Sequence, residues 1–455
     1  MTESDLSSRI SNVEHTYFYM LDYFVKGAND PSRDDMLSKL KMELFSINDE
    51  LMRRLVLSKQ GYPLLDSLPD EQTDLEYISN EGYDIISIFY SIAYRNKLID
   101  SRESKAIESF ILSDGIPDCD KGLILSALFL ASMRQYCVGA IFPLARVYVN
   151  TDLDTKLRIK ALTYLYFISF KYSNRIALDK DIKSEISLVT TTPGFSSHIA
   201  LIILQHLRSR NSDSLNAKVE KEIIPEIMKF SPKLKGLNKK NISIDEMIEA
   251  NPEWEKMMED SDLSSALKDI SEFQFDGADI FLNTFRQLSH HIFFNKVHNW
   301  FVEYGSSNDS VLRNMPDEII NVLSQADMIS DSDKFALSLS MSGLGSDMQQ
   351  MMIQSFREQA DVLAQYKADK DKSRNMAVKL LVRNIMQDLY RFFKFVGLGK
   401  CVQNPFEYMP VIDENYLIGS STLSSVDIRT CADYLLKYKF YSEAISYFDM
   451  IIRNG

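Results

Sequence analysis

Hydrophobic residues recur at helical spacing along almost the whole chain. Near the N-terminus, Tyr17, Met20, Leu21 and Phe24 fall on one face of a helix, and a longer stripe runs from Met36 to Leu55. Spacings of three and four residues are typical of helices that bury one side. Strict alternation of apolar and polar residues, which indicates strands, is almost absent. The pattern therefore predicts an all-α fold.

The helical pattern is densest between Asp118 and Arg210. It predicts helices near residues 120–132, 134–149, 154–172, 175–189 and 196–209. Connections of only a few residues force neighbouring helices to lie antiparallel. The 154–172 segment is apolar around most of its circumference and must be covered on several sides. Stacked hairpins of this kind predict an α-α superhelix, a HEAT-like helical-repeat solenoid.

The second half of the chain carries further helix signals. The aromatic residues between 281 and 301 form two apolar faces, which predict a helical hairpin with an aromatic core. Pro316 followed by acidic residues marks one helix start, and Ser330 with Asp333 has the spacing of a capping box. Two longer helices are expected at 345–366 and 374–396, with the polar residues 367–374 between them.

A change in composition marks a domain boundary. The run from Ser231 to Asn241 is polar and basic and contains Pro232 and Gly236, whereas residues 245–262 are strongly acidic. The predicted division is a helical array at 1–230, a basic linker at 231–243, a second helical array at 244–400, an irregular connection at 401–423 and a helical hairpin at 424–455.

Composition narrows the classes of function. Hydrophobic residues make up 45% and charged residues 25% of the 455 residues, which indicates a folded chain. The formal net charge of −13 repels phosphate backbones and anionic lipid. Nucleic-acid binding would need a segregated basic face, and the lysines near 233–240 are better interpreted as a solvated linker. The N-terminus lacks the basic and apolar regions of a secretory signal, and no apolar run approaches 20 residues. We expect a cytoplasmic protein that does not span a membrane.

The sequence carries no convincing motif for catalysis, a cofactor or a metal. Glycine-rich runs lack phosphate-loop spacing, and the segment Gly194–His198 lacks the second glycine of a hydrolase elbow. That segment is interpreted as a turn, with Ser196 or Ser197 capping the next helix. The four cysteines, including Cys401, are scattered with no CxxC, which indicates buried thiols in a reducing compartment.

Two groups of polar residues were weighed as metal ligands. His291 and His298 would lie about 10 Å apart on one helix, too far to share a zinc ion, and a helix break near Ser289 would point the histidines in different directions. Acidic residues such as Asp118 and Asp152 lack calcium-loop spacing and are interpreted as helix caps. No catalytic, cofactor or metal residue is predicted.

The last segment, TCADYLLKYKFYSEAISYFDMIIRNG, resembles a tetratricopeptide repeat, a pair of antiparallel helices of roughly 34 residues. Ala432 matches the small residue of the first helix and Leu435 the large residue that follows. Tyr441 precedes the turn into the second helix, and Ser442-Glu443-Ala444 matches its turn and small residue. Phe448 and Ile451 take the later packing positions. Asp427 or Ile428 stands near the usual aromatic position, no closing proline is present, and Ser424 is the expected N-cap.

This resemblance implies binding of a protein or peptide on the face of the first helix. The residues expected on that face are Arg429, Asp433, Leu436 and Lys437. Asp433 stands where such repeats carry the asparagine that clamps a peptide carboxylate, so a C-terminal carboxylate ligand is disfavoured. One repeat cannot bury its outer face alone, so the chain is expected to be the N-terminal part of a longer repeat protein.

The remainder resembles large uncharacterised bacterial helical proteins with such repeats near the C-terminus, through Asn299-Trp300-Phe301. The leading hypothesis is a non-catalytic scaffold or adaptor that binds a protein partner. The alternative is a helical enzyme or enzyme-regulatory module whose pocket is assembled from residues distant in sequence. The sequence indicates neither the partner nor the oligomeric state.

Overall fold

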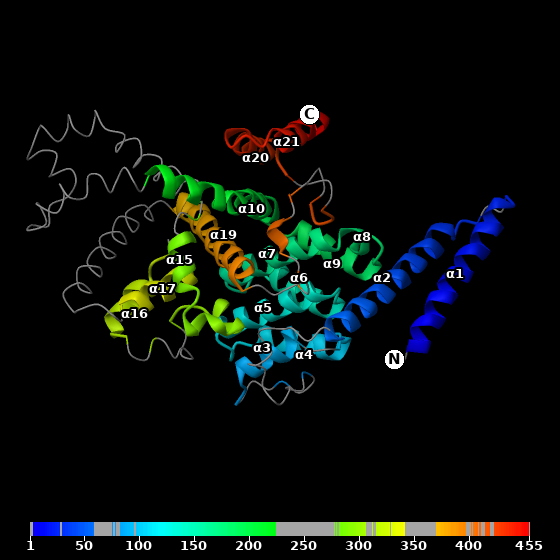
Figure 1. The fold of residues 1–455 in the computed structure, drawn as a ribbon, viewed down its shortest axis with the longest axis horizontal. Helices are drawn as coiled ribbons and strands as arrows, with labels where there is room; N and C mark the ends of the chain where they lie inside the picture. The colour runs from blue at the N-terminus through cyan, green and yellow to red at the C-terminus, as the bar shows by residue number, and fades with distance from the viewer. Residues whose placement is uncertain are drawn as a thin grey trace, which may run out of the picture.

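The computed structural model contains only helices and their connections among the residues that it describes (Figure 1). This confirms the all-α prediction for that part of the chain. The described residues are 3–27, 30–58, 82–94, 97–223, 282–305, 315–327, 329–341, 370–396, 404–407 and 423–454, with short pieces at 75, 78, 277, 279, 312, 402, 409–410 and 415–418.

The first two helices form a long hairpin that projects from the body of the molecule (Figure 1). They are α1 (Glu3–Val25) and α2 (Arg33–Ser58). Leu6, Val13 and Ile47 make a small apolar cluster between them, separate from the main core. The hairpin therefore has a core of its own.

The next eight helices include the five that were predicted, and α3, α4 and the short α8 were not predicted. Each predicted helix between 118 and 210 is present, with ends shifted by a few residues because caps and turns decide the boundaries. The elements are α3 (Ile85–Ala93), α4 (Ser101–Leu112), α5 (Asp118–Arg134), α6 (Val138–Val149), α7 (Thr155–Lys171), α8 (Ser173–Ile176), α9 (Lys180–Thr191) and α10 (Phe195–Lys218), which ends in a π-helical turn (Val219–Ile223).

Aspartates begin several of these helices, but not the two that were predicted. Asp100 and Glu103 form a capping box at α4, and Asp154 accepts the Lys156 N–H at the start of α7. Asp152 caps nothing, because it lies in the preceding turn. Asp118 is the first residue of α5, where its carboxylate pairs with Lys121 Nζ at 3.2 Å. The capping roles predicted for Asp118 and Asp152 are therefore wrong.

The aromatic segment in the second half is less regular than predicted. Its aromatic core is confirmed, since Phe285 packs against Phe294 and Trp300 with ring centroids 5.3 and 5.8 Å apart. The second half of the predicted hairpin is not an α-helix, because the Trp300 indole turns back to donate to the Phe294 carbonyl at 2.8 Å. The elements are α15 (Leu282–Leu288) and the 3₁₀ turns Ile292–Asn295 and Val297–Trp300.

Three more helices follow among the described residues before the terminal segment. Residues 370–374, predicted to lie between helices, belong to the last of them. The predicted helix 345–366 and the linker 231–243 lie outside the described residues. The helices are α16 (Asp317–Ser324), α17 (Asp331–Met341) and α19 (Lys370–Phe395).

Helix α7 lies at the centre of the body. It packs against α5, α6, α10 and α19, and Leu162, Tyr164, Tyr166 and Phe167 are fully buried on its different sides. This confirms that α7 is covered from several directions. Apolar residues from α3 to the last helices form one continuous cluster around it.

Hydrogen bonds between side chains also join segments that are far apart in sequence. Tyr90 of α3 bonds to His298 Nδ1 at 3.0 Å, and Ser169 of α7 donates to Asn415 Oδ1 at 2.7 Å. These contacts fix the second half of the chain onto the first array.

Among the described helices, none taken singly has the length and apolar composition to cross a bilayer. The α9–α10 pair meets both criteria only when joined, and it bends by 99° at its break.

Candidate interaction surface on the terminal helical hairpin

The terminal hairpin has the helix boundaries expected of a helical repeat. It consists of α20 (Ser425–Lys437) and α21 (Tyr441–Asn454), which pack closely on each other. The predicted N-cap is confirmed, because the Ser424 hydroxyl accepts the Asp427 N–H at 3.1 Å. Ala432 and Ala444 are buried where the two helices approach. Tyr441 begins the second helix and does not precede its turn, which is formed by residues 438–440.

The hairpin is held against α10. Tyr434 of α20 lies beneath the Arg208 guanidinium, 5.9 Å from its ring centroid, and its hydroxyl accepts from Asn211 Nδ2 at 3.5 Å. Tyr447 of α21 donates to the Pro410 carbonyl at 2.5 Å. These contacts place the hairpin in one position on the body (Figure 1).

The four residues predicted to contact a partner share one exposed face of α20. Arg429, Asp433, Leu436 and Lys437 are all exposed, on the side turned away from α10. Arg429 Nε lies 3.7 Å from Asp433 Oδ2, so these two charges partly neutralise each other. We call this set the α20 stripe. Its exposure was expected, whereas its binding role stays a prediction.

A second exposed face, on α21, was missed by sequence reasoning. Tyr441, Ile445 and Ile452 are 58%, 60% and 77% exposed, and their spacing places them in one line along the helix. Partly buried Phe448 lies in the same line. The signal was present as apolar residues at i, i+4, i+7 and i+11, but Phe448 was interpreted as a packing position, and Ile445 and Ile452 were given no role. We call this set the α21 stripe.

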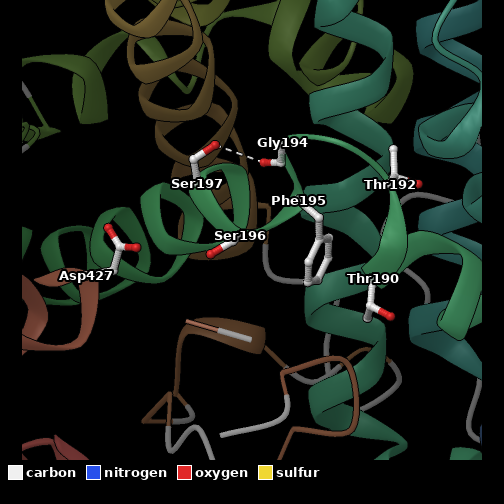
Figure 2. A pocket seen from close by; sticks show the side chains of 7 residues that line it. All are labelled: Thr190, Thr192, Gly194, Phe195, Ser196, Ser197 and Asp427. Carbon is white, nitrogen blue, oxygen red and sulfur yellow. Dashed lines mark hydrogen bonds between the residues drawn. The ribbon is translucent and has the colours of Figure 1, made fainter. Parts of the chain in front are cut away.

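A groove of about 620 Å³ lies between α20 and the corner where α9 meets α10 (Figure 2). Gly194 makes this corner with φ of +86°, a conformation that only glycine adopts without strain. The predicted caps Ser196 and Ser197 do not cap α10, because Gly194 is its N-cap and Ser197 Oγ donates back to the Gly194 carbonyl at 2.9 Å. The lining residues are Thr190, Thr192, Gly194, Phe195, Ser196, Ser197 and Asp427.

The groove is rich in hydrogen-bond acceptors. The hydroxyls of Thr190, Thr192 and Ser197 donate to backbone carbonyls of their own segment, so their oxygens are left to accept. Asp427 adds a carboxylate that already accepts from Ser424 Oγ at 2.6 Å. A ligand in this groove would have to bring N–H groups, such as those of a peptide or a basic side chain. Asp427 lies about half a turn around α20 from Arg429 and Leu436 of the α20 stripe.

Charged side chains converge elsewhere, where α7, α17 and α19 meet. Arg391 of α19 is fully buried and bonds both carboxylate oxygens of Asp279, at 2.7 and 2.8 Å. Its third nitrogen donates to Asp333 Oδ1 at 2.6 Å. On α7, Lys156 Nζ reaches Glu303 Oε1 at 2.7 Å. We call these residues the ionic cluster.

Two groups beside the ionic cluster have pKa values close to neutrality. Burial lowers the pKa of Lys160 to about 8, and the neighbouring Lys156 charge acts in the same direction. Burial raises the pKa of Asp388 to about 6, and the Asp331 carboxylate raises it further. Such shifts occur both in catalytic sites and in structural ion-pair networks. Neither residue lines the groove at the α9–α10 corner.

The histidines weighed as metal ligands occupy separate positions. The helix breaks after Leu288, and His291 caps the following 3₁₀ turn by accepting the Phe293 N–H at 3.2 Å. His298 is buried against Tyr90, and burial lowers its pKa to about 4. Across the described part of the chain, no three histidine, cysteine or acidic side chains are grouped as a metal site would need.

No known protein-family model matches the chain, and neither the curated proteins nor the solved structures include a significant match. The candidate surface therefore rests on the geometry of the hairpin.

Proposed function

We propose that this protein is a non-catalytic scaffold or adaptor that binds a protein partner on its terminal helical hairpin. The α21 stripe is the observation that carries the proposal. It presents three large apolar side chains, each more than half exposed, on a helix that is fixed to the body through α10. In helical-repeat arrays a face of this kind is covered by the next hairpin.

The partner proposed for the α21 stripe is an amphipathic helix or helical hairpin. Apolar residues at i, i+4, i+7 and i+11 match the spacing of the anchors that such a helix offers. The α20 stripe, with Arg429, Asp433 and Lys437, would supply polar contacts at the edge of the interface. The acceptor-rich groove would take N–H groups from an extended segment of the same partner. Nucleic acid and anionic membrane are not proposed, because the chain carries a net charge of −13.

The proposal extends to architecture and location. The antiparallel hairpins of α3–α10 and of α20–α21 support a right-handed α-α superhelix of HEAT-like and tetratricopeptide-like units. Among the described residues, the thiols of Cys119 and Cys431 form no disulfide, which supports a cytoplasmic location, since reducing compartments keep thiols reduced.

The test is affinity capture from native lysate with quantitative mass spectrometry. We would compare the full chain with the double variant Ile445→Asp/Ile452→Asp. Ile292→Asp is the matched control, because Ile292 is 75% exposed in a 3₁₀ turn away from the hairpin. A partner retained by the wild type and the control, and reduced at least tenfold for the double variant, is the expected result.

A partner captured equally by the wild type and the double variant would contradict the assignment to the α21 stripe. Failure of the full chain to enrich any partner over a tag-only control would contradict the scaffold function. Circular dichroism of each variant excludes unfolding, which is not expected because all three isoleucines face solvent.

A second candidate function, a helical enzyme, is favoured by one observation. Lys160 and Asp388 come from α7 and α19 and have pKa values displaced toward neutrality, as acid and base catalysts do. The test is incubation with a metabolite extract. A substrate consumed by the wild type and spared by Lys160→Met/Asp388→Asn would support the enzyme.

A further inference from the structure

The α1–α2 hairpin is covered on only part of its surface. Arg9 of α1 bonds Glu43 Oε1 at 2.6 Å and Ser46 Oγ at 3.0 Å of α2. On its other side α2 meets the body, where Lys180 Nζ lies 3.0 Å from Asp35 Oδ1 and Arg175 pairs with Asp49. Helix α1 is the outer helix of the two (Figure 1).

One flank of α1 is strongly apolar. Leu6, Val13 and Met20 are buried in contacts within the molecule. A second line of large apolar residues remains 44–76% exposed, although polar residues would be expected on the solvent face of a surface helix. We call this line the outer stripe, and its members are Ile10, Tyr17, Phe18, Leu21 and Val25.

The outer stripe is symmetric about its own middle. Ile10 and Val25 lie equally far before and after the Tyr17–Phe18 pair, and Glu14 and Leu21 are likewise equidistant from it. An antiparallel copy would therefore set Ile10 against Val25 and the aromatic residues against each other, while Glu14 would face Leu21. The ends and the centre of the stripe are thus self-complementary, as a two-fold interface requires.

The exposed area suffices for such an interface. The five side chains expose roughly 600 Å² in each chain, given the usual areas of aromatic and aliphatic side chains. Two copies would thus bury at most about 1,200 Å², which is at the lower end of the range of specific interfaces. A membrane surface fits less well, because the whole chain is acidic and anionic lipid would repel it.

We propose that two copies of this chain associate through antiparallel packing of their α1 helices, with Ile10 facing the partner's Val25 and Tyr17 facing the partner's Phe18. This surface is separate from the terminal hairpin, so it does not depend on the proposed scaffold function. Because each copy carries a net charge of −13, added salt should strengthen the association by screening repulsion.

The first test is sedimentation velocity on the full chain over a concentration series at low and high salt. We expect a dimer whose dissociation constant rises at least tenfold in Leu21→Asp. Leu188→Asp is the matched control, since Leu188 is 52% exposed on α9, and its dissociation constant should stay within twofold of the wild type. A monomer at all concentrations, or equal weakening by both variants, would overturn the proposal.

The second test fixes the direction of packing. Ile10→Cys and Val25→Cys variants are oxidised singly and as a mixture, with the wild type as background for the native cysteines. Antiparallel packing predicts a disulfide-linked dimer in the mixture only. Cross-linking of Ile10→Cys with itself, or a monomer that instead floats with zwitterionic or anionic vesicles, would refute the assigned partner.

Discussion

The Arg391 guanidinium and the Asp279 carboxylate form a bidentate pair with almost no access to solvent. Burial acts to lower the pKa of Arg391, but Asp279 and Asp333 raise it above its usual value, so the charge is retained. The guanidinium also lies 4.3 Å from the centre of the Phe285 ring. The pair therefore joins α19 to the segment before α15 at a point where water cannot substitute for a lost partner.

Replacing Asp279 with Ala should lower the free energy of unfolding by about 3 kcal/mol, because it leaves a buried charge with only one carboxylate. Urea unfolding followed by circular dichroism measures the change. The control is Asp22→Asn, which breaks the exposed Lys26–Asp22 pair and should cost under about 0.5 kcal/mol. Equal effects of the two substitutions would show that the buried pair contributes no more than a surface pair.

Gly139, near the start of α6, has no room for a side chain. A Cβ there would stand 2.3 Å from the Ile99 carbonyl oxygen, and backbone cannot yield as a flexible side chain does. Gly139→Ala should therefore destabilise the fold by about 2–4 kcal/mol. Gly115→Ala is the control, since its nearest neighbour would be at 3.7 Å, and it should be neutral or stabilising by about 0.5 kcal/mol. Thermal unfolding of the two variants separates these outcomes, and similar melting temperatures would disprove the close approach.

Stability should fall with acid because of His206. Burial lowers the pKa of His206 to about 3, so the unfolded chain binds this proton near pH 6.5 while the folded chain does not. The unfolded state then holds more protons between these values, and the free energy of unfolding decreases by up to about 1.4 kcal/mol per pH unit.

The comparison variant is His206→Gln, which should flatten the slope between pH 6.5 and 4.5 in urea unfolding. His290→Gln, at an exposed position, serves as the control and should retain the wild-type slope. If His206→Gln kept that slope as well, the proton would be taken up elsewhere.

Asp388 should affect the pH dependence of stability in the opposite direction from His206, lowering the free energy of unfolding as the pH rises. Its folded pKa of about 6 exceeds the unfolded value near 3.9, so the folded chain holds the proton more tightly and is penalised as pH rises through 6. Asp388→Asn removes that penalty while its amide oxygen can still accept the Ser332 N–H. The variant should be more stable than the wild type by about 1–3 kcal/mol at pH 8.

The same Asp388→Asn comparison at pH 4 serves as an internal control, since the difference in unfolding free energy should nearly vanish there. A variant that is less stable than the wild type at pH 8 would mean that the Asp388 charge is favourable in the ionic cluster.

The sequence predicted what depends on neighbours along the chain. Helices between 118 and 210 were placed correctly because each has an apolar face and a short polar connection. The caps were harder, since Asp152 and Asp154 are equally suitable by type and only backbone geometry selects Asp154. The 3₁₀ turns before Trp300 could not be predicted, because the hydrogen bond from the Trp300 indole to the Phe294 carbonyl forms only in the folded tertiary structure.

Part of the candidate site was likewise predicted from local sequence, and part of it was not. Exposure of the α20 stripe followed from helical spacing, and the structure places its four residues together. The α21 stripe was not identified, because periodicity does not reveal which apolar face has a neighbour. Buried Arg391 was not singled out in the sequence, since its partner Asp279 is 112 residues away.

The central position of α7 means that it is synthesised well before one of the helices that cover it. This helix is apolar on most sides, and α19, which covers one of them, leaves the ribosome about 200 residues later. At about 5–20 residues per second, that interval lasts roughly 10–40 s. During this time part of α7 is open to solvent in the nascent chain, so a chaperone that shields apolar helices would act on this protein between the emergence of α7 and that of α19.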